Sequence, residues 1–313
     1  MCNENQTVVT ELVLTGFQNT YKTKVILFCF ILLVHLCTVI GNLLIIFLVS
    51  SSHILRRPMY LFLSNLALAD LIVSSSIVPN MLCIIWLDGH TMTINGCATQ
   101  YFFVFVSTYA QCCLLMIMSF DRYLAICLPL RYSSIMSTNF SLRLVILAWL
   151  IGMLLIKVEL ILIGQLQFCT SNIIDHFFCD FAPLLALSSS EVTVYELAQL
   201  DFSFNIFVIF LPFVCITISY ICIFFVILNI ASVSGKKKAL STCSSHLIVV
   251  CTYYGSLITV YMAPARASSL YENKFRSLLF VMLTPFTNPI VYSLRNKDIK
   301  DALSKLFCNR QSK

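Results

Sequence analysis

The sequence predicts an all-α integral membrane protein, a bundle of seven transmembrane helices with a short amphipathic helix at its C-terminal end. Hydrophobic residues make up 59% of the 313-residue chain and charged residues only 11%, and the mean hydropathy is +0.91. A soluble domain is roughly half apolar and about a quarter charged. The apolar residues also fall into seven segments, each at least as long as the ~20 residues of helix that a bilayer requires.

The seven apolar segments are expected at residues 25–50, 59–86, 98–127, 142–164, 197–230, 239–262 and 275–294. The third belongs to the run 97–127, which would measure about 45 Å as a helix. That length exceeds the ~30 Å hydrocarbon core and predicts a tilted span. The fourth is the least clearly apolar, because Lys157 and Glu159 interrupt it. The seventh is short and polar, so neighbouring helices must shield it from lipid.

A charge pair lies near the end of the third segment. Asp121 and Arg122 stand at its end, shortly before Pro129, and therefore close to one membrane surface. Charges at that depth are costly, so their usual explanation is function. The alternative is that these charges only help to fix the orientation of the helix at the inner membrane face.

Basic residues indicate the orientation. An odd number of spans places the two termini on opposite sides, and of 20 Lys and Arg residues 14 fall on the side of the C-terminus and 6 on the other. By the positive-inside rule the C-terminus is cytoplasmic and the N-terminus extracellular. The net charge of +6 then reflects orientation and inner-leaflet lipid rather than a nucleic-acid partner. The glycosylation sequon at Asn5 would face the side on which glycans are added.

The whole chain, 1–313, is expected to form a single domain. Residues 1–24 would be an extracellular N-terminus, 25–294 the helix bundle and 295–313 a cytoplasmic tail. No cationic and apolar leader precedes the first span, which would act as its own signal. In the tail, Ile299 and Leu303 recur at helical spacing with lysines opposite, which predicts an interfacial helix.

Most of the 15 cysteines lie within the spans, where cysteine behaves as a small hydrophobic residue. Cys97, Cys169 and Cys179 face the exterior, where disulfides form. A bond from Cys97 to the loop between the fourth and fifth spans would hold that loop over the bundle. From the residues alone, Cys169 and Cys179 are both possible partners.

Short motifs occur in order from residue 41 to residue 296. They are Gly41-Asn42, PMYLFL at 58–63 with LA at 66–67 and Asp70, SFDRYLAIC at 119–127 with PLRY at 129–132, HFFCD at 176–180, SY at 219–220, KALSTCSSHL at 238–247 and NPIVYSLRN at 288–296. Together they resemble the olfactory (odorant) receptors, a subfamily of the rhodopsin-like G-protein-coupled receptors. The resemblance covers nearly the whole chain.

The resemblance implies a multi-pass receptor of the plasma membrane that binds a small, mostly apolar odorant in an outward-facing transmembrane pocket. It also implies activation of a heterotrimeric G protein of the stimulatory, olfactory type, which raises cyclic AMP. The expected partners are the odorant, the G protein and membrane lipid, and no cofactor is expected. The residues that the resemblance assigns to coupling and switching are Asp121, Arg122, Tyr123, Tyr220, Asn288, Pro289 and Tyr292.

The chemistry of these residues suits a switch. The guanidinium of Arg122 is planar and permanently charged, so it can exchange one partner for another. It would pair with Asp121 in the closed state and with the hydroxyls of Tyr220 and Tyr292 after release. Proline residues such as Pro212 and Pro289 permit helix bends, although a mere packing role is the alternative.

A candidate ligand pocket lies on the outer half of the bundle. Tyr101, Val104, Phe105 and Thr108 share one face of the third segment. In the family arrangement Phe204, Val208, Tyr254, Ile258 and Tyr261 lie at comparable depth. This aromatic and aliphatic wall suits a compact, largely apolar molecule with one hydrogen-bonding group. Alternatively, these residues only pack the bundle.

Glu159 raises a further question about the ligand. It would be solvated near the interface, which favours a neutral odorant, or be neutralised by Lys157 or another cation, or bias the chamber toward a basic ligand. Solvation, and with it a neutral odorant, is the favoured interpretation.

Two departures from the family pattern matter. Gln111 stands where many odorant receptors carry an acid, which weakens the case for a sodium ion at Asp70, within a polar cluster formed with Asn42 and Asn288. Ser189 stands where many carry the cysteine that partners Cys169. The resemblance therefore implies a disulfide between Cys97 and Cys179.

Other classes of function find little support. No phosphate loop, paired catalytic carboxylates or nucleophile with its base is present, so an enzyme is not expected. A channel or transporter should show charged residues along several spans or two similar halves, and neither is evident. Cys243 and His246 could ligate a metal at their helical spacing, but packing is the favoured interpretation and no metal site is expected.

Overall fold

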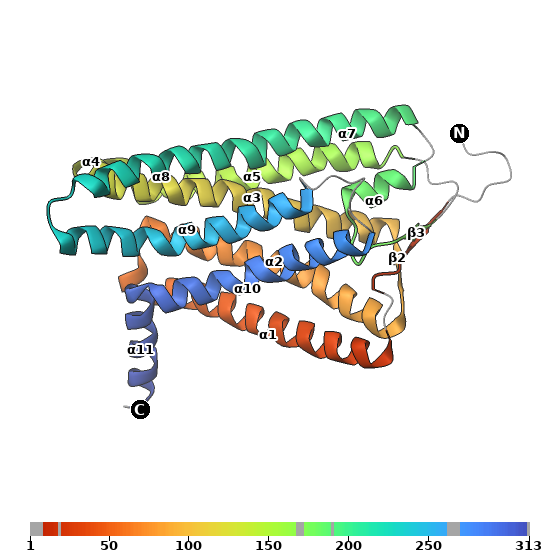
Figure 1. Ribbon diagram of the computed structural model, residues 1–313, viewed down its shortest axis with the longest axis horizontal. Helices are drawn as coiled ribbons and strands as arrows, with labels where there is room; N and C mark the ends of the chain where they lie inside the picture. Colours follow the sequence, from red (N-terminus) through yellow and green to blue (C-terminus); the bar gives the residue numbers. More distant parts are fainter. Residues whose placement is uncertain (1–8, 18–19, 167–171, 189–190, 262–269, 312–313) are drawn as a thin grey trace.

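The computed structural model describes residues 9–17, 20–166, 172–188, 191–261 and 270–311. Within these residues seven helices are long and apolar enough to cross a membrane, and they run side by side as one bundle (Figure 1). A short helix follows the last of them. The predicted fold class is confirmed.

The spanning helices are α1 (Tyr21–Ser51), α2 (Pro58–Leu87), α3 (Ile94–Cys127), α5 (Thr138–Ile163), a continuous helix made of α7 (Glu191–Asn205), the π-helical turn η2 (Ile206–Phe210) and α8 (Leu211–Asn229), then α9 (Val233–Tyr261) and α10 (Leu270–Arg295). The shorter helices are η1 (His53–Leu55), α4 (Pro129–Ile135), α6 (Phe181–Ala186) and α11 (Lys297–Gln311). In Figure 1, α11 turns away from the axis of α10.

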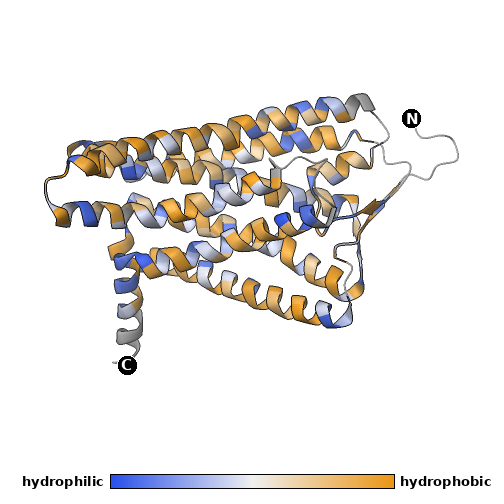
Figure 2. Ribbon diagram, viewed as in Figure 1, coloured by the Kyte–Doolittle hydropathy of each residue, from blue (hydrophilic) through white to orange (hydrophobic). Residues whose placement is uncertain are grey.

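The central helix is α3, which is mostly buried and packs against α2, α5 and α8. Gly152 of α5 permits a close approach, since a Cβ atom there would lie 2.8 Å from the carbonyl oxygen of Val106. The outer helices leave large apolar side chains exposed, among them Phe30, Leu150 and Phe224. Figure 2 shows hydrophobic residues along most of each spanning helix. Lipid is the solvent that suits such a surface.

Prolines lie inside three of the spanning helices, with Pro79 in α2, Pro212 in the α7–α8 helix, and Pro285 and Pro289 in α10. Pro212 has no N–H to donate to the carbonyl of Val208, and the π-helical turn Ile206–Phe210 lies just before it. In α10, Pro289 likewise leaves the carbonyl of Pro285 without a donor from its own helix. Asn42 of α1 supplies one, with its Nδ2 3.0 Å from the Pro285 oxygen.

A small sheet, absent from the prediction, caps the end of the bundle at which the chain begins. The strands β1 (Glu11–Leu14), β2 (His90–Thr93) and β3 (Ile173–Ile174) lie in the order β2-β1-β3, with β1 antiparallel to β2 and parallel to β3. Leu12 and Leu14 of β1 point into the core. We call this the strand end, and the opposite end, where the chain finishes, the α11 end.

Candidate functional site

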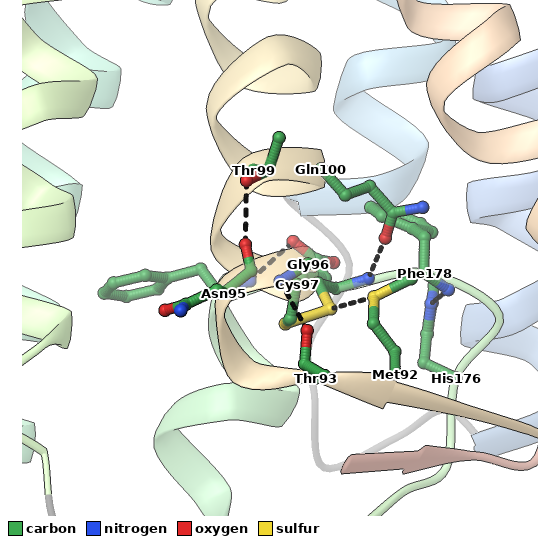
Figure 3. The surroundings of a disulfide bond; sticks show 12 residues. Met92, Thr93, Asn95, Gly96, Cys97, Thr99, Gln100, His176 and Phe178 are labelled. Atoms are coloured by element: carbon green, nitrogen blue, oxygen red, sulfur yellow. Dashed lines mark hydrogen bonds between the residues drawn. A yellow bond between two sulfur atoms is a disulfide. The ribbon is translucent and has the colours of Figure 1, made fainter. Parts of the chain in front are cut away.

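Two tethers hold the loop between α5 and α7 over the strand end. The first is a disulfide between Cys97 of α3 and Cys179, with a Cα–Cα distance of 5.6 Å. Beside it the Gln100 side chain accepts a hydrogen bond from the Cys179 N–H at 2.9 Å (Figure 3). The same side chain donates to the Ser76 carbonyl at 2.8 Å. The loop is thus fixed to α3 and α2. Cys169, the other candidate partner, and Asn5 lie outside the described residues.

The second tether is Lys274 of α10. Its Nζ donates to the carbonyl oxygen of Gly16 at 2.7 Å and to the Asp175 carboxylate at 2.5 Å. Thr15 also donates to Asp175, at 2.7 Å. Burial alone would raise the pKa of the Asp175 carboxyl, but these hydrogen bonds outweigh it and hold that pKa below its usual value. The segment after β1, the loop and α10 are therefore joined by one buried cation.

Beneath this cover lies a cavity of about 630 Å³, a size typical of small-molecule sites. Its walls come from α3, the segment from β3 through α6, the α7–η2 helix and the strand-end parts of α9 and α10. Apolar side chains dominate, and polar groups are spaced among them. We refer to it as the strand-end cavity.

Only some of the predicted pocket residues line the strand-end cavity. Phe105 and Thr108 line the strand-end cavity. Tyr101 and Val104 are buried one turn away on α3, and the Tyr101 ring lies 4.3 Å from that of Phe105. Val208 is buried and Phe204 half-buried; neither lines the cavity as described.

Two further pocket candidates lie elsewhere. Tyr254 and Ile258 line a separate groove of about 650 Å³ between α8 and α9, almost entirely apolar. Ile258 is exposed on its outer side. The side chain of Tyr261 lies outside the described residues.

The expectation that Glu159 is solvated is wrong. Its side chain is 1% exposed, and Oε2 accepts a hydrogen bond from the Tyr101 hydroxyl at 2.9 Å. Residues two apart on a helix point about 200° apart, so Lys157 is exposed while Glu159 faces α3. Lys157 therefore does not neutralise it.

Sequence reasoning missed the acidic part of the cavity wall, which consists of Asp175, Asp180 and Asp201. Asp180 caps α6, accepting from the Phe181 N–H at 2.8 Å, and burial raises its pKa to about 6. The sequence feature that could have indicated this acidic wall is Asp201, an ionisable residue inside the fifth apolar segment.

The polar cluster at mid-depth forms around Asp70. Gln111 and Asn288 each donate to one of its carboxylate oxygens, both at 2.8 Å. Asn42 instead donates to the carbonyls of Thr38 and Pro285. In the described part of the chain no three His, Cys, Asp or Glu side chains gather in a way that could hold a metal ion.

The charge pair lies at the α11 end. The Arg122 guanidinium is 3.1 Å from the Asp121 carboxylate and contacts the sulfur of Met59. Asp121 also accepts from the hydroxyl of Tyr132 of α4 at 2.8 Å. Burial and the neighbouring Asp121 charge raise the pKa of Tyr132, so this hydroxyl keeps its proton and remains a donor.

The remaining switch candidates surround this pair. Tyr220 and Tyr292 lie near enough to feel the Arg122 charge. The Tyr220 hydroxyl is 2.7 Å from Nδ1 of His246, while the buried Tyr292 hydroxyl has no hydrogen-bond partner among the described residues. Tyr123 packs beside Phe120, with ring centroids 6.4 Å apart. Pro289 packs on Gly41, where a Cβ atom would lie 2.9 Å from the proline ring.

Comparison with known proteins gives a consistent result. The family profile described as olfactory receptor matches residues 28–310. Olfactory receptor 11H6 of Homo sapiens is 42% identical over 305 residues, 97% of this chain and 92% of that protein. Olfactory receptor 1500 of Rattus norvegicus is 39% identical over 311 residues, 99% of both chains.

The fold has a counterpart among solved structures. The crystal structure of squid rhodopsin matches with a TM-score of 0.73 at 18% identity, over 93% of this chain and 87% of the rhodopsin chain. The arrangement of seven helices is therefore shared with a rhodopsin, and the sequence relatives are receptors rather than enzymes. The chain belongs to the olfactory receptor family.

Proposed function

We propose that the protein is an odorant receptor of the plasma membrane that binds a small, mostly apolar ligand in the strand-end cavity. In this proposal the α11 end activates a heterotrimeric G protein of the stimulatory, olfactory type, and cyclic AMP rises. The observation that carries it is the separation of two sites in one bundle. A cavity of about 630 Å³ lies at one end, and the buried Asp121–Arg122 pair lies at the other.

The orientation of the chain belongs to the same proposal. With 14 of the 20 Lys and Arg residues on the side of the C-terminus, the strand end is extracellular and α11 lies at the cytoplasmic face. Asn5 would then be glycosylated. Residues 1–24, 25–294 and 295–313 form the extracellular segment, the bundle and the cytoplasmic tail of one domain.

The switch would operate through Arg122. In the structure its guanidinium pairs with Asp121 within α3, and the unpartnered Tyr292 hydroxyl lies within reach of its charge. Outward movement of α9 would let Arg122 leave Asp121 for tyrosine hydroxyls and for the G protein. The exchange requires no proton transfer by the arginine, because the guanidinium stays charged throughout.

The proposal is tested with an Arg122→Ala variant in cells that express the full receptor. Agonists are first identified on the wild type with a panel of volatile compounds, and cyclic AMP is the readout. Arg122→Ala should abolish the response while an epitope tag shows normal surface expression. Arg143→Ala, which removes an exposed charge of α5, should respond like the wild type. Undiminished signalling by Arg122→Ala would exclude the proposed switch.

A further inference from the structure

The strand-end cavity is lined by more acidic side chains than the described basic side chains pair with. Asp175, Asp180 and Asp201 line it, and neither Lys nor Arg appears among its described lining residues. Lys274 pairs with Asp175, so that carboxylate is compensated. Asp180 and Asp201 have no ion pair with any described cation.

Asp180 is the better buried of these two acids, with only 9% of its surface exposed. One carboxylate oxygen accepts the Phe181 N–H, and the other has no partner in the described part of the chain. His176 lines the same cavity but does not neutralise the negative charge of Asp180. Burial and the nearby Lys274 charge lower the pKa of His176 to about 4, so the imidazole is neutral at physiological pH.

Asp201 extends the acidic region into the bundle. It interacts electrostatically with Asp180 on one side and with Glu159 on the other, and the amide of Asn205 supports it. The hydroxyl of Tyr101 gives Glu159 a neutral donor rather than a cation. Buried acids without a cation are costly, and a bound cation would offset that cost.

The rest of the wall suits the hydrocarbon part of such a cation. Phe105, Phe181 and Ile209 line the same cavity as the acids. Aromatic faces also attract ammonium groups. A carboxylate ligand would instead meet like charges, which costs binding energy.

We propose that the strand-end cavity selects small aliphatic or arylalkyl amines, with the protonated nitrogen held by Asp180 and Asp201 and the hydrocarbon packed on Phe105 and Phe181. The inference rests on the proposed function only for the placement of the ligand in this cavity. It narrows the ligand class from apolar molecules in general to organic cations.

The test uses purified full-length receptor in nanodiscs of neutral lipid and measures the melting temperature, a readout that involves no G protein. The probes are butylamine, cyclohexylamine and phenethylamine, each with the alcohol and the carboxylic acid of the same skeleton. At least one amine should raise the melting temperature at a concentration tenfold or more below that of its alcohol, about 1.4 kcal/mol. The matched carboxylate should have no effect.

Variants then locate the cation. Asp201→Asn should shift the effective amine concentration upward at least tenfold, whereas Glu196→Gln, an exposed acid on the same helix, should leave it unchanged. Asp180→Asn serves if Asp201→Asn does not fold, since asparagine also caps helices. The inference is overturned if no amine stabilises the receptor, if an alcohol or a carboxylate matches its amine, or if the folded variant responds like the wild type.

A parallel cyclic AMP assay separates the two proposals. Amine stabilisation without a cyclic AMP response would support the cation site and contradict the proposed coupling. A cyclic AMP response to neutral volatiles, with no stabilisation by amines, would overturn the cation site and leave the proposed coupling standing.

Discussion

At the residue scale, Glu159 shows how tyrosine hydroxyls make a buried carboxylate tolerable. The side chain lies inside the bundle at 1% exposure, where an unsatisfied charge would cost several kcal/mol. The Tyr101 hydroxyl donates to it at 2.9 Å, and hydrogen bonds to charged groups are the stronger kind. The residue that interrupts the fourth apolar segment therefore joins α5 to α3.

A Tyr101→Phe substitution tests this bond. The ring and its contact with Phe105 are kept, but the hydrogen bond from the Tyr101 hydroxyl to Glu159 is lost, so the free energy of unfolding should fall by about 1–3 kcal/mol. The measurement is the melting temperature of the purified receptor at neutral pH. Tyr195→Phe, an exposed tyrosine of α7, is the control. Equal melting of both variants would mean that the hydroxyl contributes nothing to stability.

The sequence singles out both Tyr101 and Glu159 but does not show that they are hydrogen-bonded to each other. Tyr101 was assigned to the ligand wall and Glu159 to the solvated interface, because spacing along one helix shows which residues share a face but not which neighbour that face meets. The same limit applies to Asp180 and Asp201, which come from a loop and a helix and meet only in the fold.

At the element scale, the packing of α1 on α10 depends on a proline. Pro289 cannot donate to the carbonyl of Pro285, and Asn42 of α1 replaces the missing N–H at 3.0 Å. Gly41 beside it lets the two helices approach closely. Gly41 and Asn42 thus meet Pro285 and Pro289 in one complementary contact.

This contact predicts coupling between Asn42 and Pro289. Asn42→Ala should lower the free energy of unfolding by about 1–3 kcal/mol, because a buried carbonyl loses its donor. In a Pro289→Ala background the new backbone N–H of residue 289 can serve Pro285, so the same substitution should cost less. The measurement is a double-mutant cycle of melting temperatures. The control is Asn65→Ala, because the Asn65 side chain contacts Trp149 of α5. It should lower the free energy of unfolding by the same amount in both backgrounds. If Asn42→Ala also causes the same loss with and without Pro289→Ala, the two residues are not coupled.

The elements themselves were largely predictable. The seven apolar segments correspond to the seven spanning helices, because lipid requires long apolar helices whose backbone groups bond internally. The polar cluster was foreseen from Asn42, Asp70 and Asn288, yet Asn42 turns to a backbone carbonyl instead. β1 was missed, because Glu11–Leu14 has no strand partner nearby in the sequence. Its partners β2 and β3 begin at residues 90 and 173.

At the scale of the whole molecule, Lys274 joins three remote parts of the chain. It binds the Gly16 carbonyl, 258 residues earlier, and the Asp175 carboxylate, 99 residues earlier. The cover of the strand-end cavity is thus connected to α10, the helix that also carries Asn288 and Tyr292. Nothing in the local sequence of any of these segments indicates the contact, since it depends on how the whole bundle places the helix ends.

Replacement of Lys274 by methionine should loosen this cover. Lys274→Met keeps an apolar stem of similar length but removes the donor to Gly16 and Asp175, so the melting temperature should fall at neutral pH. The pKa of the Asp175 carboxyl lies below its usual value, so its stabilisation is complete above pH 3.8 and is lost as the pH falls through that lowered pKa. The difference in melting temperature between wild type and variant should therefore narrow below about pH 3.8.

Lys24→Met, which breaks the pair of Lys24 with the exposed Asp88, should have a smaller effect at neutral pH because exposed pairs contribute little. A larger loss in Lys24→Met, or a Lys274→Met difference that does not narrow in acid, would contradict the role given to this buried cation.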